Sequence, residues 1–112
     1  MEDCLFCKIA AGDIPSDCLF EDDRVYAFKD IAPQAPVHFL VIPKEHIPSA
    51  ACVDETNSAL VAHIFEVIAR LAKEQGLEGF RVVSNVGESA GQTVKHLHFH
   101  MLGGKTMGEK II

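Results

Sequence analysis

The sequence predicts an α+β fold built on a five-stranded, mainly antiparallel sheet with one long and one short helix. Five short runs rich in β-branched and aromatic residues are joined mostly by short connections, which is typical of antiparallel pairing. One long stretch, residues 55–75, repeats its apolar residues at helical spacing. The 112 residues are 48% hydrophobic, so a single domain over residues 1–112 is expected.

The first half of the chain contains the short helix and three of the strands. Residues 4–11 are compatible with a helix. Cys18–Glu21 and Val25–Lys29 are strand-like runs on either side of a turn-forming Asp-Asp pair, so they predict a hairpin. Residues 30–36 contain two prolines and are expected to be irregular. Val37–Pro43 is β-branched and apolar, which indicates a central strand.

The second half contains the long helix and two more strands. The helix over residues 55–75 is expected to end at Gly76, because glycine commonly follows a helix C-terminus. Residues 80–85 predict a strand, and residues 86–93 (VGESAGQT) form a glycine-rich loop. Residues 94–102 alternate in polarity and predict the fifth strand. A sheet of five strands exposes a long edge, which favours dimerisation.

Charge and composition exclude several classes of function. The net charge is −6 and no basic cluster is present, which argues against binding to nucleic-acid polymers. No stretch approaches 18 consecutive apolar residues, so no association with a membrane through a span is expected. The first residues include acids and no long apolar run, which is unlike a secretory signal. With four cysteines, this indicates a reducing compartment, and the cytoplasm is the expected location.

Three histidines alternate with apolar residues in the predicted fifth strand. His96, His98 and His100 are two residues apart, so a strand places all three on one face and the intervening apolar residues on the other. A solvated polar face is one interpretation. Imidazole is instead typical of sites that exchange protons near neutral pH or bind metal, and three in register favour such a site.

The glycine-rich loop before the histidines supports a phosphate site. Gly87 and Gly91 allow close backbone approach to a ligand, and successive N–H groups in such a loop can bind an anion. Thr93 adds a hydroxyl at the end of the loop. Taken alone, the loop is equally compatible with an ordinary connection. Next to the three histidines it points to a phosphate-bearing ligand.

These segments resemble the histidine triad (HIT) family. Residues 96–102 (HLHFHML) match its His-φ-His-φ-His-φ-φ signature, where φ is apolar. Residues 91–94 (GQTV) and 102–104 (LGG) are similar to the Hint branch, the histidine triad nucleotide-binding proteins. Residues 21–24 (EDDR), 30–36 (DIAPQAP) and 38–44 (HFLVIPK) also match that branch, so the resemblance covers nearly the whole chain in order.

The resemblance implies a HIT-like fold and a purine nucleotide-binding hydrolase. Hint-like proteins cleave the P–N bond of adenosine 5′-phosphoramidates, including AMP-amine and AMP-lysine adducts, through a nucleotidyl-histidine intermediate. The implied partners are a purine nucleoside monophosphate or phosphoramidate and a second copy of the chain, in a homodimer with a ten-stranded sheet. Three alternatives remain: a dinucleoside polyphosphate hydrolase, a nucleotide-binding interaction module with low turnover, and a metalloenzyme whose three triad histidines hold a catalytic metal.

The resemblance also implies catalytic roles for particular residues. His98, the middle histidine, would be the nucleophile, and His100 would hydrogen-bond the phosphate oxygens. His96 and the distant His38 would complete a proton relay toward the leaving amine. Thr93 would lie near the leaving group.

The nucleotide-binding residues are likewise implied by matching position. An apolar slot would hold the base, a carboxylate would bind the ribose hydroxyls, and an amide would contact phosphate or sugar. The full implied set is Phe6, Ile9, Ile14, Phe28, Asp30, Ile31, Asn85, Gly91, Gln92, Thr93, Val94, His98 and His100.

Cys4 and Cys7 form a Cys-x-x-Cys pair. From the residues alone, the pair supports zinc binding and redox chemistry about equally. HIT relatives with this pair resemble zinc proteins, and the matching ligand set here is Cys4, Cys7, His46 and His96, with two unligated thiols as the competing interpretation. One departure stands out: residues 107–112 lack the Trp-Pro-Pro-Gly-like tail of the best-known Hint proteins, which puts tail-mediated substrate selection in doubt.

Overall fold

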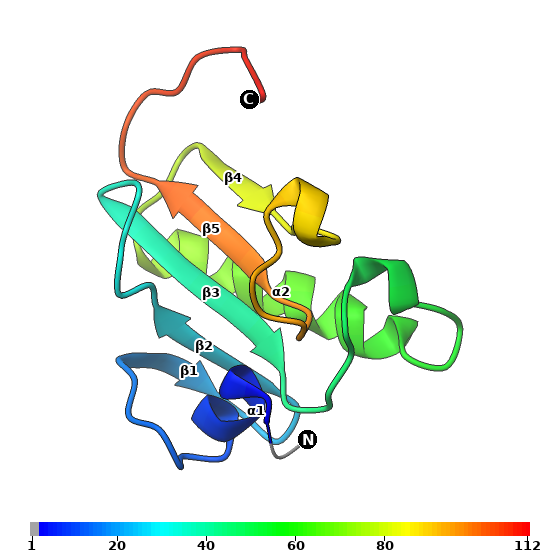
Figure 1. Ribbon diagram of the computed structural model, residues 1–112. Helices are drawn as coiled ribbons and strands as arrows, with labels where there is room; N and C mark the ends of the chain where they lie inside the picture. The colour runs from blue at the N-terminus through cyan, green and yellow to red at the C-terminus, as the bar shows by residue number, and fades with distance from the viewer. Residues whose placement is uncertain (1–2) are drawn as a thin grey trace.

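A five-stranded antiparallel sheet with strand order β1-β2-β3-β5-β4 organises the computed structural model, which describes residues 3–112 (Figure 1). Every neighbouring pair of strands is antiparallel. The fold class and element order predicted from the sequence are confirmed. The strands are β1 Cys18–Glu21, β2 Val25–Lys29, β3 Val37–Pro43, β4 Phe80–Val83 and β5 Phe99–Gly103.

The two faces of the sheet are covered differently. Helix α2 (Ser58–Glu74) packs behind the sheet over β3 and β5, and its apolar stripe forms the larger core with the inward residues of those strands. Helix α1 (Leu5–Ala10) lies in front, across β2 and β3, over a smaller apolar cluster. His38 of β3 and His100 of β5 lie on this front face, since their chain neighbours Phe39 and Met101 face the larger core. No helix among residues 3–112 has the length and apolar character needed to cross a bilayer.

The largest boundary error concerns β5, which begins at Phe99 and not at residue 94. The neighbouring strand β4 ends near this level, at Val83 opposite His100, whereas β3 continues to Pro43, two residues beyond the Val41–Phe99 pair. The Pro43 carbonyl accepts a hydrogen bond from the His96 ring at 2.8 Å. Residues 94–96 form a bend, and the alternation of faces resumes after it, because Leu97 is buried in the α2-side core.

The other boundaries shift less. The long helix begins at Ser58 and ends at Glu74, so it is shorter than the predicted 55–75, and α1 is shorter than residues 4–11 by one residue at each end. The strand predicted over residues 80–85 ends at Val83. Two short 3-10 helices, Ala50–Cys52 and Glu88–Ala90, were not predicted, since turns of three residues leave no periodic pattern.

A partly buried ion pair joins α2 to the β1–β2 turn. His63 Nε2 lies 2.6 Å from Asp22 Oδ2, and both side chains are about a quarter exposed. The hydrogen bond to Asp22 raises the pKa of His63, and burial opposes that rise. Burial by itself raises the pKa of the Asp22 carboxyl. Its hydrogen bonds, first among them the one to His63, outweigh burial, so the pKa is lowered. This histidine serves the fold, on the face of the sheet opposite the triad.

Replacing His63 by glutamine should therefore lower the free energy of unfolding in a pH-dependent way. A folded-state pKa raised above the unfolded value of 6.5 stabilises the protein fully below about pH 6.5, and the contribution disappears as the pH rises through the folded value. We expect a loss of about 1 kcal/mol at pH 6 and a smaller loss at pH 8.5, measured by urea denaturation. Glu66→Gln, which alters only the exposed 3.4 Å contact to His63, is the control. A loss that grows with pH would contradict this account.

Candidate functional site

His98 is held in one tautomer at the front of the sheet. Its Nδ1–H donates to the carbonyl oxygen of His96 at 2.7 Å, because a carbonyl oxygen can only accept. In the neutral ring the lone pair is therefore on Nε2, the nitrogen available to attack an electrophile. His98 is 6% exposed, and its main-chain carbonyl accepts a hydrogen bond from the Ser84 hydroxyl at 2.8 Å. The ring orientation and the tautomer of His98 are thus both determined by the main-chain carbonyl of His96.

A hydrogen-bonded chain fixes the tautomer of His100 in the same way. The Gln34 N–H donates to His38 Nδ1 at 3.0 Å, so the neutral His38 ring carries its proton on Nε2. That Nε2–H lies 2.9 Å from His100 Nδ1, which accepts it. The His100 proton is consequently on Nε2. His98 therefore offers a lone pair on Nε2, and His100 offers a hydrogen-bond donor on its own Nε2. The centroids of the two rings are 5.1 Å apart.

The pair His38–His100 lies next to one carboxylate. Asp30 Oδ2 is 3.4 Å from His38 Nε2, and Asp30 Oδ1 accepts the N–H of Ala32 at 2.8 Å. Burial lowers the pKa of His100 to about 4, positive charge on His98 or His38 lowers it further, and the Asp30 charge opposes the shift. His100 is therefore neutral at pH 7 and acts as a hydrogen-bond donor, not as a cationic acid.

The apolar residues implied for the base slot gather beside the triad, with one exception. Phe6, Phe28 and Ile9 are buried in the front cluster, and Ile14 and Val94 pack against it. The Phe6 ring meets His98 edge-on at a centroid distance of 4.9 Å and Phe28 at 5.6 Å. Ile31 is 99% exposed and does not belong to this cluster, so the structure does not bring it to the other base-slot residues. It lies on the irregular β2–β3 connection, where no strand register controls its direction.

The glycine-rich loop is braced from inside by Gln92. Its side-chain carbonyl accepts the Gly87 N–H at 2.9 Å, and its amide donates to the carbonyls of Pro48 and Val94. Gln92 thus shapes the loop through its side chain, and its contact with a nucleotide stays a prediction. Gly91 has φ +89°, a conformation that strongly favours glycine. Thr93 is exposed, near the second site described next.

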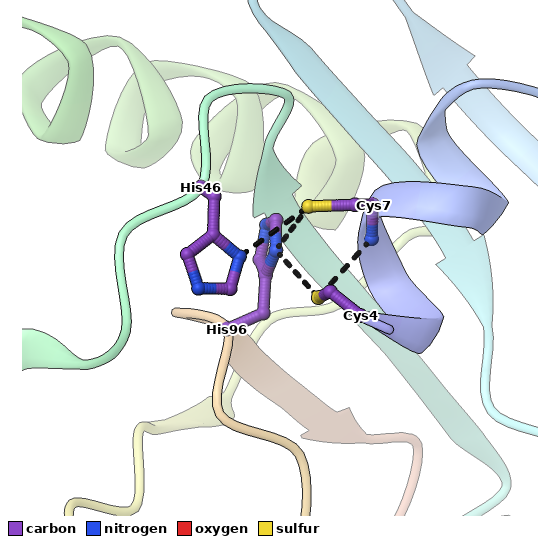
Figure 2. A group of neighbouring side chains, drawn as sticks. All are labelled: Cys4, Cys7, His46 and His96. Atoms are coloured by element: carbon purple, nitrogen blue, oxygen red, sulfur yellow. Dashed lines mark hydrogen bonds between the residues drawn. The ribbon is translucent and has the colours of Figure 1, made fainter. Parts of the chain in front are cut away.

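The second site joins α1 to two distant segments through four soft or borderline donors (Figure 2). Cys4 Sγ and Cys7 Sγ lie 3.3 and 3.4 Å from His96 Nδ1, and Cys7 Sγ lies 3.3 Å from His46 Nδ1. All four donor atoms fall within 4.8 Å of one another. The N–H of Leu97 donates to the carbonyl of Ile47 at 2.6 Å and so ties the two histidine-bearing segments together.

This geometry fits a tetrahedral metal ion. Bonds of about 2.1–2.3 Å at tetrahedral angles separate neighbouring donors by about 3.5 Å, which is close to the 3.3–3.4 Å observed. Burial, together with the neighbouring Cys4, raises the pKa of the Cys7 thiol, so two thiolates here require a nearby cation. His96 Nε2 donates to the Pro43 carbonyl, which leaves Nδ1 as the metal-facing lone pair. Burial lowers the pKa of His96 to about 4, and the ring is neutral at pH 7.

Comparison with known proteins identifies the family. The family model described as scavenger mRNA decapping enzyme C-term binding matches residues 3–111. An uncharacterised HIT-like protein of Synechococcus elongatus is 47% identical over 95% of this chain and 94% of its own length. The chain belongs to the histidine triad (HIT) family.

Solved structures of HIT proteins have the same fold throughout. A HIT family hydrolase from Clostridium thermocellum is 46% identical, with a TM-score of 0.97 over 100% of this chain and 99% of its own. A histidine triad protein from Clostridium difficile is 49% identical, with a TM-score of 0.94 over 98% and 97% of the two chains. These relatives support a hydrolase at the level of the HIT family, and the five-stranded HIT fold is confirmed.

Within this HIT protein the first triad histidine differs in role from the other two. Both ring nitrogens of His96 already have partners, the Pro43 carbonyl and the cysteine pair, so it does not fit the expected relay with His38. The three triad rings also do not converge: His96 Nδ1 faces the cysteines, whereas His100 Nδ1 faces His38. This divergence argues against one catalytic metal held by all three. It separates His96, which belongs to the second site, from His98 and His100.

The partners that sequence reasoning missed are mostly main-chain groups. The carbonyls of Pro43 and His96 and the N–H of Gln34 orient the three rings that matter most. Such groups carry no residue-specific signal. Ser84 is the exception, because a lone hydroxyl at the end of an apolar strand is a visible feature of the sequence.

Proposed function

We propose that this HIT protein hydrolyses the P–N bond of adenosine 5′-phosphoramidates, as AMP-amine or AMP-lysine adducts, through a nucleotidyl-histidine intermediate. The observation that carries the proposal is the pairing of a lone pair on His98 Nε2 with a donor on His100 Nε2. Phosphoryl transfer needs a positioned nucleophile and donors around the developing charge, and the two rings supply both.

The reaction proceeds in two displacements at phosphorus. In the first, His98 Nε2 forms a bond to phosphorus and the P–N bond breaks, with its electron pair leaving on the amine nitrogen, which takes up one proton from solvent. The His100 Nε2–H hydrogen-bonds a phosphoryl oxygen and stabilises its charge. In the second, water attacks phosphorus, the bond to His98 breaks, AMP leaves and one proton returns to solvent.

The nucleoside is held on the α1 side of the two rings. The Asp30 carboxylate is an acceptor suited to the ribose hydroxyls, and Phe6 and Phe28 offer aromatic faces and edges for a purine. In this proposal the glycine-rich loop lies beside the phosphate at the end of β4, and Asn85, which follows β4, contacts phosphate or sugar.

The direct test is an assay of amine release from adenosine 5′-phosphoramidate, with diadenosine tetraphosphate as the comparison substrate. We expect faster turnover of the phosphoramidate. Faster cleavage of the polyphosphate would favour the alternative hydrolase. Binding of AMP with negligible turnover of both would favour a nucleotide-binding module.

We also propose that the Cys4–Cys7–His46–His96 site holds a structural zinc ion. Two thiolates and two imidazoles are an ordinary Cys₂His₂ set with no open coordination position. The six residues of α1 are too few for a helix to be stable alone, and ligands at its N-cap and first turn would anchor it. The chemistry of zinc-bound thiolates suits a reducing compartment, so we place the protein in the cytoplasm.

We further propose a homodimer formed through the edge of β4. This strand has only β5 as a neighbour, and Phe80, Val82 and the α2 residue Phe65 expose apolar surface on the helix side. Pairing of two β4 strands would extend the sheet to ten strands. Light scattering is expected to give twice the 12.2 kDa mass of the chain, and a mass of one chain at micromolar concentration would contradict the dimer.

A further inference from the structure

A groove on the triad face of the sheet is lined by two cations and adjoins the catalytic pair. It has a volume of about 330 Å³. Its walls come from the loop before β3, the end of β5, the middle of β4 and the chain after β5. The residues that matter here are Gln34, Arg81, Leu102 and Lys105.

Strand register places this groove next to His38 and His100. Leu102 pairs with His38 of β3 on one side and with Arg81 of β4 on the other, so all three share one row on the same face. Adjacent strands are about 4.8 Å apart, which puts the Cα of Arg81 about 10 Å from that of His38. His100 lies in the next row, opposite Val83. The Gln34 N–H that fixes the His38 ring belongs to the residue that lines the groove.

The order of side chains along β5 sets the direction in which a leaving group departs. His98, His100 and Leu102 follow one another on the same face. In-line displacement sends the leaving group away from the nucleophile. Attack from His98 on phosphorus held at His100 therefore directs the amine toward Leu102 and into the groove. The nucleoside lies on the other side, next to Phe6 and Phe28.

The charge of the groove is locally opposite to that of the chain. The protein carries a net charge of −6, yet Arg81 and Lys105 line the groove and none of its lining residues is acidic. Glu78 lines the hollow on the far side of these two cations and does not line the groove. Arg81 donates to the carbonyl of Gly108, which holds the guanidinium in place, and within residues 3–112 its other donors have no partner and are open to a ligand. A planar guanidinium with free donors matches a carboxylate.

We infer that the Arg81–Lys105 groove binds a carboxylate on the departing amine, so that phosphoramidates of AMP whose amine carries a free carboxylate are preferred over those whose amine does not. This inference rests on the proposed function. Arg81 would act as a specificity-determining residue, and the nucleotide half of the substrate would be held as described above.

The test compares two substrates that differ at one group, a carboxylate against a carboxamide: the adenosine 5′-phosphoramidates of alanine and of alaninamide. We expect wild type to prefer the carboxylate by about tenfold or more in kcat/KM. Arg81→Gln should remove most of that preference by slowing the alanine substrate alone, and Lys105→Gln should remove part of it. Arg24→Gln changes the same charge in the β1–β2 turn, at the opposite edge of the sheet, and is expected to leave the preference intact. Equal kcat/KM for both substrates in wild type would overturn the inference.

A binding measurement separates this inference from the proposed reaction. Calorimetry on the His98→Ala protein gives the affinity of both compounds without turnover, with and without Arg81→Gln. If wild type cleaves neither compound but the carboxylate still binds about tenfold more tightly through Arg81, the reaction assignment fails and the groove stands. If affinities are equal and unaffected by Arg81→Gln, the groove fails. Thermal melts of each variant show whether loss of the Gly108 contact has unfolded the tail-bearing edge, and Arg81→Lys, which keeps the charge, should retain part of the preference.

Discussion

Replacing His98 by alanine is expected to reduce kcat/KM for adenosine 5′-phosphoramidate by about a thousandfold or more, with little change in AMP affinity. The reason is geometric. His98 Nε2 is the lone pair exposed by the hydrogen bond from Nδ1 to the His96 carbonyl, and no other ring in the site offers one in that place. A thousandfold loss corresponds to about 4 kcal/mol of transition-state stabilisation. Removal of a nucleophile generally has effects of at least this size.

Two measurements distinguish a nucleophile from a merely structural residue. Rapid quenching of wild type with excess substrate should trap a nucleotidylated chain, seen by intact mass spectrometry and absent from His98→Ala. The smaller His98→Gly variant should regain part of its rate when free imidazole is added, because the cavity can admit the missing ring. His63→Gln serves as the histidine control, since that ring lies on α2 beside Asp22. Full activity in His98→Ala would refute the assignment.

The fold was predictable to the extent that side chains alone define it. The bounds of β1, β2 and β3 match the prediction because turn residues and prolines delimit them in the sequence. The sorting of faces in residues 96–102 was also predictable, since alternation persists wherever the backbone is extended. The start of β5 was not, because it depends on where β4 stops and on the His96 ring bonding to the Pro43 carbonyl, and both are properties of the assembled sheet.

The site was predictable as a set of residues but less so as a set of roles. The resemblance to HIT proteins grouped Cys4 and Cys7 with His96, which lies 92 and 89 residues away from them, and the structure brings them into contact. It also assigned His96 to both sites, although one imidazole has only two nitrogens. Only the positions of the Pro43 carbonyl and of the thiols show how those nitrogens are used. Ile31 and Gln92 show the same limit, since matching position does not reveal exposure or internal hydrogen bonding.

Replacing Cys4 or Cys7 by serine should remove the metal and lower the stability of the whole chain. Wild type purified without chelator is expected to contain about one zinc per chain, and each variant far less. The expected loss is at least about 3 kcal/mol of the free energy of unfolding, since structural zinc sites contribute much of the folding energy of small units. For a chain of this size that is a fall in Tm of about 10 °C or more. Cys18→Ser and Cys52→Ser, at exposed cysteines, are the matched controls.

Loss of the metal should also disturb the nucleophile, because the two sites share His96. Its ring faces the cysteines, and its carbonyl fixes the His98 tautomer. Phe6 provides a second connection. It lies between Cys4 and Cys7 in the chain, and its ring meets that of His98 edge-on. The hydrogen bond to the His96 carbonyl should slow the exchange of the His98 Nδ1–H proton with water. We therefore expect its NMR signal to be visible in the metal-loaded protein and to be broadened or lost after chelation.

Cobalt replacement supplies the spectroscopic check on the ligand set. A Co²⁺ ion bound by two thiolates and two imidazoles in a tetrahedron should give intense d–d bands and a thiolate charge-transfer band, and Cys7→Ser should weaken both. His46→Ala should shift the d–d bands while the charge-transfer band remains. Wild type that contains no metal after purification, and whose Tm is unchanged by chelator, would show that Cys4 and Cys7 are two unligated thiols. In that case the 3.3–3.4 Å contacts of His96 would be ordinary S–H hydrogen bonds that orient the same carbonyl without an ion.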